Sequence, residues 1–128
     1  MKLGLLTAPF EDTPLNDVAD WAGQNGFSAF EVACWPASGS EKRRYAGTSH
    51  INVDGLTKTL GDDITGGLAE RGIEISGLGY YPNPLHADAD HRDEVNGHLK
   101  KVITAAGTMG ISVVNTFLGG DRALNVDE

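Results

Sequence analysis

Apolar residues along the chain follow two periods, a helical one and the shorter one of buried strands. Three times an apolar helix face ends at a glycine that precedes a run rich in β-branched and aromatic residues; these glycines are Gly26, Gly72 and Gly110. A glycine just past a helix end adopts the left-handed conformation that closes the last turn, and the residues after it favour a strand. The wide spacing of the repeat indicates β/α units rather than a sandwich, whose strands recur every ~8–12 residues.

Three helices are predicted between these repeats. The first begins at Thr13-Pro14, where an N-cap residue precedes a proline at the first helical position. The second has apolar residues at strict four-residue spacing but is weakened by internal glycines, and the third, over 88–108, has acidic residues in its first turn. The expected buried faces are Leu15, Val18, Ala19 and Ala22 in the first helix, Leu56, Leu60, Ile64 and Leu68 in the second, and Val95, Leu99, Val102, Ile103 and Ala106 in the third.

Strands and helices therefore alternate, and the strands are expected at 2–7, 29–35, 74–80 and 112–118. Right-handed crossovers place parallel strands side by side, with helices on one face as in a barrel or on both faces as in a doubly wound sheet. The doubly wound fold needs a nucleotide-binding signature, and Pro82 stands where the third glycine of such a signature would follow Gly77 and Gly79. We predict an α/β protein with one domain over 1–128, the N-terminal half of a β/α barrel that stops after its fourth strand.

Composition and charge narrow the range of partners. The formal net charge of the 128-residue chain is −8, which disfavours nucleic acid because such binding depends on Lys and Arg that replace counterions. It also disfavours an anionic membrane surface, and the basic stretch Lys42-Arg43-Arg44 is interpreted as a solvated loop. No segment approaches the ~20 apolar residues of a membrane span. Cys34 is the single cysteine, so no intrachain disulfide can form and we expect a cytoplasmic protein.

Candidate chemistry lies at the carboxyl ends of the strands, where ligands bind in both architectures. Alternation along the second strand places Phe30 and Val32 toward the helices and Glu31 on the opposite, concave face. Asn115 stands as far after Gly110 as Glu31 stands after Gly26, so the two polar side chains should share one layer of a barrel. Two interpretations stay open: a structural hydrogen-bonded pair below the site, or a role toward the substrate.

Aromatic residues and histidines provide further candidates. Trp35 and Phe117 could wall a sugar pocket or fill the mouth of the barrel, and His86 lies in the loop that would overhang a site. His86 could act as an acid or base, bind a phosphate or simply be solvated. The two glycines Gly119-Gly120 could approach a phosphate closely, although such a loop is common. Burial is expected to make Cys34 unsuitable as a catalytic thiol.

A metal site on the third helix is the weaker interpretation of its histidines. His91 and Glu94 have i,i+3 spacing, and His98 follows two turns after His91. These side chains could hold a metal ion, but an exposed helix face explains them better.

Three strings of the sequence resemble the sugar phosphate isomerase/epimerase family, which has the xylose-isomerase-like TIM barrel. They are Gly-Phe-Ser-Ala-Phe-Glu-Val at 26–32, Gly-Ile-Glu-Ile-Ser-Gly-Leu-Gly-Tyr-Tyr-Pro-Asn-Pro-Leu at 72–85 and Val-Val-Asn-Thr-Phe-Leu-Gly-Gly-Asp-Arg at 113–122. The resemblance implies isomerisation or epimerisation of a sugar or sugar phosphate beside a divalent metal (Mn, Mg, Zn or Co). The family holds that metal on its later strands, so no metal ligand or catalytic base is assigned here.

The first hypothesis is the N-terminal portion of such an isomerase/epimerase, which supplies the substrate-side wall of the site. That wall would consist of Trp35, Tyr81, His86 and Phe117, with Glu31 and Asn115 beneath it. The alternatives are a non-catalytic sugar- or polyol-binding barrel fragment and, with a weaker resemblance, an abasic-site endonuclease-like barrel.

Four strands of a barrel would leave two open edges and an uncovered concave face. The apolar part of that face is expected to include Leu5, Ala33, Leu78 and Phe117. Because exposed apolar area is unfavourable, we expect self-association or pairing with the other half of the barrel.

Overall fold

The computed structural model of the chain describes residues 1–38 and 47–121. The basic stretch at 42–44 and the last residues, 122–128, lie outside this part. The described elements are β1 (Gly4–Leu6), α1 (Leu15–Gln24), β2 (Ala29–Ala33), α2 (Lys58–Ala69), β3 (Glu74–Gly79), α3 (Ala89–Met109) and β4 (Val114–Asn115).

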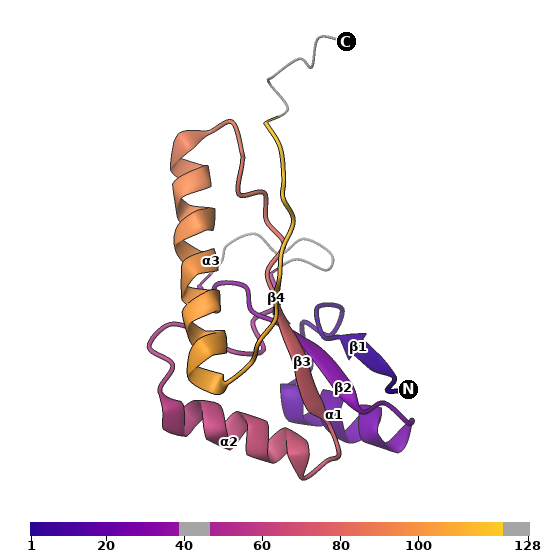
Figure 1. The fold of residues 1–128 in the computed structure, drawn as a ribbon. Coiled ribbons are helices and arrows are strands. Elements are labelled where there is room, and N and C mark those ends of the chain that lie inside the picture. Colours follow the sequence, from indigo (N-terminus) through magenta and orange to yellow (C-terminus); the bar gives the residue numbers. More distant parts are fainter. Residues whose placement is uncertain (39–46, 122–128) are drawn as a thin grey trace.

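Four parallel strands form one sheet in the order β1-β2-β3-β4 and alternate with three helices (Figure 1). Sequential order with a helix in each crossover is the arrangement of a β/α barrel rather than of a doubly wound sheet. The predicted fold class is confirmed, although each strand is shorter than predicted. None of the three described helices combines the length and apolar character that crossing a bilayer requires.

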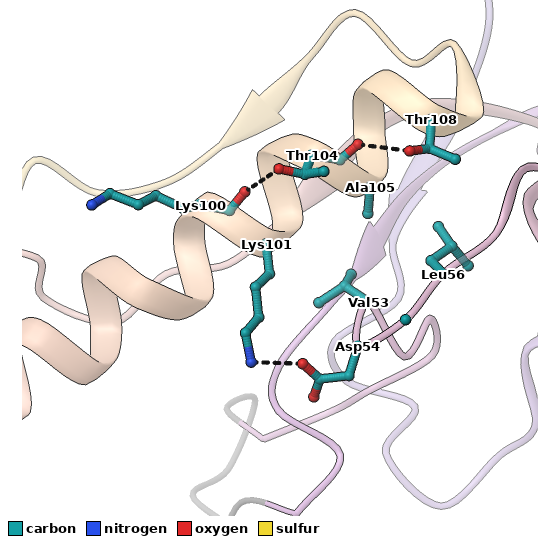
Figure 2. Close-up of a pocket in the computed structure, with 9 residues that line it drawn as sticks. Val53, Asp54, Leu56, Lys100, Lys101, Thr104, Ala105 and Thr108 are labelled. Atoms are coloured by element: carbon teal, nitrogen blue, oxygen red, sulfur yellow. Dashed lines mark hydrogen bonds and ion pairs between the residues drawn. The ribbon is translucent and has the colours of Figure 1, made fainter.

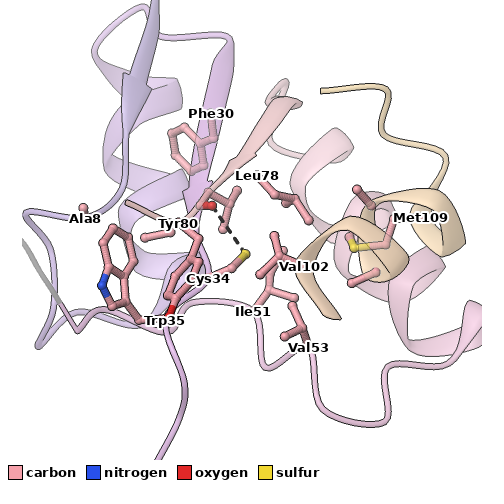
Figure 3. Packing of buried hydrophobic residues seen from close by; sticks show 14 of the residues in the cluster. Ala8, Phe30, Cys34, Trp35, Ile51, Val53, Leu78, Tyr80, Val102 and Met109 are labelled. Carbon is pink, nitrogen blue, oxygen red and sulfur yellow. Dashed lines mark hydrogen bonds between the residues drawn. The ribbon is translucent and has the colours of Figure 1, made fainter. Parts of the chain in front are cut away.

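The helix-facing side of the sheet holds the hydrophobic core (Figure 3). Phe30 and Val32 of β2 and Leu78 of β3 are fully buried there. They share one cluster with residues from all three helices: Val18, Ala19 and Ala22 of α1, Leu68 of α2, and Val95, Val102, Ala105, Ala106 and Met109 of α3. The orientation predicted for Phe30 and Val32 is therefore confirmed.

A β-bulge in β3 changes the alternation that the sequence predicts for this strand. Phe30 pairs with Ile75, but Glu31 pairs with Gly77, so Ser76 is an extra residue in the ladder. The hydroxyl of Ser76 donates a hydrogen bond to the carbonyl of Phe30, 3.0 Å away. An extra residue moves every later side chain of the strand to the opposite face.

Two of the four apolar residues expected on the concave face lie on the helix side instead, and a third is not exposed. Leu78 lies on the helix side because of the bulge, Leu5 pairs with Phe30 and packs against the core, and Ala33 is completely covered. The exposed apolar residues in and next to the strands include Leu6 (37% exposed), Val113 (41%) and Phe117 (60%).

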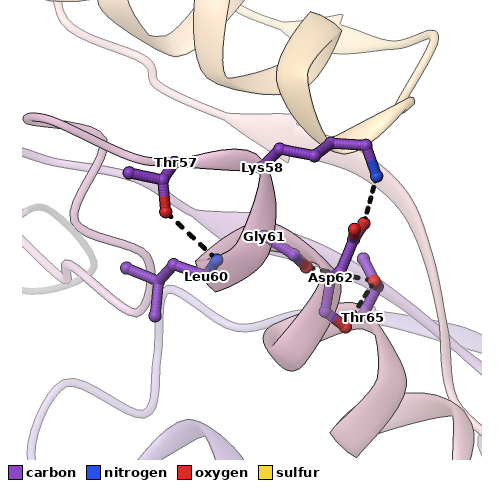
Figure 4. Close-up of polar contacts among 6 residues, drawn as sticks. All are labelled: Thr57, Lys58, Leu60, Gly61, Asp62 and Thr65. Carbon is purple, nitrogen blue, oxygen red and sulfur yellow. Dashed lines mark hydrogen bonds and ion pairs between the residues drawn. The ribbon is translucent and has the colours of Figure 1, made fainter.

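The second helix buries most of the predicted face, because Leu68 is buried and Leu56 and Ile64 pack against the core, but Leu60 is an exception. Thr57 caps α2 by accepting a hydrogen bond from the backbone N–H of Leu60, 3.2 Å away (Figure 4). The side chain of Leu60 is 49% exposed, since a strict four-residue spacing drifts around a helix of 3.6 residues per turn. Gly61 is buried instead, and a Cβ there would lie 2.9 Å from the Cγ of Met109. This glycine, expected to weaken α2, lets α2 and α3 pack closely.

The remaining two helices differ from the prediction in single residues. Pro14, rather than Thr13, caps α1 and provides no side-chain hydrogen bond. Asp88 caps α3 as its acidic first turn suggested. Ile103, expected in the buried face of α3, is 54% exposed, and His98 is buried on that helix.

Candidate functional site

Glu31 is the centre of a polar network on the concave side of the sheet. The hydroxyl of Tyr81 donates a short hydrogen bond to its Oε1, and the Nδ2 of Asn115 donates to its Oε2 at 2.7 Å. Glu31 is the middle residue of β2, Tyr81 lies just after β3 and Asn115 ends β4, and these strands are neighbours in the sheet. The prediction that Glu31 and Asn115 share a layer is confirmed, and Tyr81 joins them.

Two glycines of β3 provide the space for this network. A Cβ at Gly79 would lie 2.7 Å from Oε1 of Glu31 and 3.1 Å from Cε2 of Tyr81. A Cβ at Gly77 would lie 3.4 Å from the Nδ2 of Asn115. The Gly-Leu-Gly string of β3 therefore makes room for side chains of the neighbouring strands, and this explains two glycines that match no nucleotide-binding signature.

Aromatic rings form a continuous wall beside Glu31. The ring of Trp35 lies 5.7 Å from that of Tyr80 and 6.0 Å from that of Tyr81, between centroids. Tyr81 in turn lies 4.9 Å from Phe117. Trp35 is buried, whereas Phe117 is exposed at the open end of this row. The structure thus brings together Trp35, Tyr81 and Phe117, as the sequence predicted, in positions where apolar ring faces and a carboxylate meet.

Burial and the neighbouring carboxylate keep the site phenols protonated. Desolvation, together with the hydrogen bond to Glu31 and the charge of Glu31, raises the pKa of Tyr81 above its usual value. Desolvation, with a smaller contribution from Glu94, raises the pKa of Tyr80 to about 12. Burial likewise raises the pKa of the Cys34 thiol to about 12, so this side chain is a poor nucleophile and its predicted burial is confirmed.

His86 lies apart from this cluster, at the beginning of α3. Its Nδ1 accepts a hydrogen bond from the backbone N–H of Asp88 at 3.1 Å, and its ring lies 4.6 Å from that of His91. Because Nδ1 acts as an acceptor, the neutral ring carries its proton on Nε2. His86 is exposed, and its role toward a substrate stays a prediction.

The other histidines of α3 do not share one face. His91 and Glu94 are exposed, but His98 is buried. The Nε2 of His98 donates a hydrogen bond to the carbonyl of Cys34 at 2.8 Å, and its ring lies 4.6 Å from that of Tyr80. His98 therefore joins α3 to the end of β2, and the exposed face expected for all three side chains is wrong for this residue.

Asn83 has a role that the sequence did not reveal. Its Nδ2 donates to the carbonyl of Gly120 at 2.7 Å, and its Oδ1 accepts from the N–H of Gly120 at 3.0 Å. Its Oδ1 also accepts from the N–H of Leu85 at 3.0 Å. One side chain thus fastens the loop after β3 to the loop after β4. The sequence features that could have indicated this contact are an asparagine between two prolines in one loop and two consecutive glycines in the other.

A groove lies elsewhere, between α3 and the segment that leads to α2 (Figure 2). It has a volume of about 370 Å³ and contains the ion pair between Lys101 Nζ and Asp54 Oδ1, 2.7 Å apart. That pair lowers the pKa of Asp54. The hydroxyls of Thr104 and Thr108 donate to carbonyls of their own helix. None of the predicted site residues lines this groove.

A divalent metal, which the resemblance implies, does not fit the described part of this site. Across residues 1–38 and 47–121, no three His, Cys, Asp or Glu side chains converge in a way that could hold a metal ion. Glu31 is the one carboxylate of the network, and its partners, the phenol of Tyr81 and the amide of Asn115, are neutral. The described residues of the site therefore offer too few ligands for a divalent metal.

Together, the strand order, the one-sided helices and a site at the carboxyl ends of the strands define the N-terminal half of a TIM barrel of the xylose-isomerase-like type. Known protein families and curated proteins gave no match to the sequence. Solved structures did match. D-psicose 3-epimerase, crystallised in the presence of D-fructose, aligns with a TM-score of 0.60 and 16% identity over 99% of this chain and 42% of its own.

Two further solved structures show the same fold. The probable 3-DHS dehydratase AsbF of Bacillus anthracis, involved in petrobactin synthesis, has a TM-score of 0.58, 18% identity and coverage of 91% of this chain and 38% of its own. A sugar phosphate isomerase/epimerase from Parabacteroides distasonis aligns with a TM-score of 0.54 and 14% identity. The alignment covers 92% of this chain and 39% of that structure's chain. This chain thus spans about two fifths of the length of the structures it matches, and these similarities show the fold.

Proposed function

We propose that this chain supplies the substrate-side wall of a metal-dependent sugar isomerase/epimerase. One observation carries the proposal: the Glu31 carboxylate, held by Tyr81 and Asn115, lies beside the aromatic row at the carboxyl ends of the strands. Structures with this fold include D-psicose 3-epimerase and a sugar phosphate isomerase/epimerase.

The residues of the wall have complementary roles toward a sugar. The exposed ring of Phe117, next to Tyr81, offers an apolar surface to the C–H face of a sugar. The fixed carboxylate of Glu31 accepts hydrogen bonds from sugar hydroxyls, because an ionised carboxylate has lone pairs beyond the two that Tyr81 and Asn115 use. The metal and the proton-transferring base belong, in this proposal, to strands outside this chain.

Tryptophan fluorescence tests whether the wall binds a sugar. The sequence has two tryptophans, so Trp21→Phe leaves Trp35 as the single reporter at the site. We expect a saturable change of Trp35 emission with D-fructose, reduced about tenfold in affinity by Glu31→Gln, which weakens a charge-assisted hydrogen bond. The matched control is Trp35→Phe, which leaves Trp21 on α1 and should show no response. No saturable change up to the solubility limit of the sugar would contradict the proposal.

Turnover tests whether the chain is catalytic by itself. We expect the 128-residue chain alone to convert no sugar in the presence of Mn²⁺. Calorimetry with Mn²⁺ is the companion measurement, and tight stoichiometric binding would show that this chain holds the metal itself and would overturn the division of roles proposed here.

A further inference from the structure

Gly119 and Gly120 form a loop that could approach a phosphate group, but the side chain of Asn83 occupies it. The N–H and the carbonyl of Gly120 are both hydrogen-bonded to the amide of Asn83. A Cβ at Gly119 would lie 1.9 Å from Oδ1 of Asn83, and the φ of Gly119 is +72°. Glycine is required here both for the backbone conformation and for the close approach of Asn83.

Glycine loops bind phosphate through free backbone N–H groups that point at its oxygens. In this chain the Gly120 N–H is already donated to Asn83, so phosphate would have to displace a side chain that makes three hydrogen bonds. Displacement would also leave the carbonyl of Gly120 without this donor. The loop is therefore closed against an anion rather than prepared for one.

Charge on the concave side also disfavours the binding of phosphate. Glu31 presents a carboxylate there, and the donors bound to its two oxygens, Tyr81 and Asn115, are neutral. A second anion near a carboxylate is repelled, whereas a hydroxyl group can donate to it. This arrangement favours an uncharged polyhydroxy ligand.

We propose that Asn83 closes the glycine loop after β4 to phosphate and that the site accepts an unphosphorylated sugar or polyol rather than a sugar phosphate. The substrate class in this statement rests on the proposed function, whereas the closure by Asn83 does not. The two parts are tested separately.

The closure is tested with inorganic phosphate by NMR of backbone amides. In the wild-type chain the Gly120 amide should not shift with phosphate, and in Asn83→Ala it should shift saturably. Its solvent exchange should accelerate about tenfold in Asn83→Ala, the equivalent of one hydrogen bond of ordinary strength. Asn52→Ala is the matched control. The side chain of Asn52 accepts a hydrogen bond from the Asp54 N–H, two residues on, just as the side chain of Asn83 accepts one from the Leu85 N–H, but Asn52 has no hydrogen bond to Gly119 or Gly120.

A saturable phosphate shift of Gly120 in the wild type overturns the closure, and so does a folded Asn83→Ala variant that ignores phosphate. If Asn83→Ala does not fold, the wild-type titration decides alone.

The substrate class is tested with D-fructose and D-fructose 6-phosphate in the Trp35 fluorescence assay. We expect D-fructose to bind at least about tenfold more tightly, with a smaller ratio in Asn83→Ala. Tighter binding of the phosphate ester overturns the assignment. If neither sugar binds, both the proposed function and the substrate class are contradicted. The phosphate titration then still tests the closure by Asn83.

Discussion

The two faces of the sheet are built from the same strands but have opposite character. On the helix side, Phe30, Val32 and Leu78 are fully buried in one cluster. On the concave side, Glu31 has a hydrogen-bond network, while Leu6 and Phe117 are exposed. The comparison shows that the packing that stabilises the fold is concentrated on the helix side, whereas the candidate chemistry lies on the concave side.

The largest expected effect concerns what covers the concave face. Exposed apolar area is unfavourable by ~25 cal/mol per Å², so covering a few hundred Å² would contribute on the order of 5–10 kcal/mol. We expect the 128-residue chain to associate at micromolar concentrations, as measured by light scattering. Phe117→Asp should weaken association, and Leu60→Asp, on an exposed face of α2, should not. A stable wild-type monomer would contradict this expectation.

The next effect compares two phenylalanines from the two faces. Phe30→Ala should lower the free energy of unfolding by ~3–5 kcal/mol, because it removes a fully buried ring and leaves a cavity. Phe117→Ala should lower it by less than about 1.5 kcal/mol, since this ring is 60% exposed and its packing partner is Tyr81. Urea unfolding at concentrations below association measures both. Equal losses would show that the two faces do not differ in stability as proposed.

Local patterns predicted the fold and the polar pair of the site. The glycines that follow the helices are Gly26, Gly72 and Gly110, all with positive φ, and β2, β3 and β4 each begin within four residues of one of them. Counting equal distances from two of these glycines was enough to place Glu31 beside Asn115. This worked because helix ends and strand starts are set by residues close in sequence.

Features that depend on pairing could not be predicted in the same way. Ser76 forms a bulge only because β3 pairs with β2 in a shifted register, so Leu78 was assigned to the wrong face. The contact of Asn83 with Gly120 depends on two loops that meet in space. Gly61 was interpreted as a weak point of its helix, since nothing nearby in sequence indicates Met109.

A third prediction uses two glycines that differ only in what surrounds them. Gly79→Ala should destabilise the fold by ~1–3 kcal/mol, because the new methyl group would lie 2.7 Å from Oε1 of Glu31. It should also abolish the Trp35 response to sugar by displacing Glu31. Gly97→Ala on α3 meets no atom within 4 Å and should stabilise by ~0.5–1 kcal/mol through helix propensity. A neutral Gly79→Ala would show that Glu31 is not held in this position.

The smallest effect is a loss of stability that Tyr80 causes only in alkali, where its phenol ionises. Burial raises the pKa of Tyr80 to about 12 from an ordinary value of 10.0, so the folded state binds the phenolic proton more tightly than the unfolded state does. The resulting stability is fully present below pH 10 and is lost as the pH rises toward 12. The difference in unfolding free energy between wild type and Tyr80→Phe should therefore be constant up to pH 10 and then shift against the wild type. Using the difference cancels the titration of Tyr81 and of the lysines, which both proteins share. Urea unfolding at stepped pH measures it, and a flat difference across this range would mean that Tyr80 is not desolvated behind Trp35 and His98.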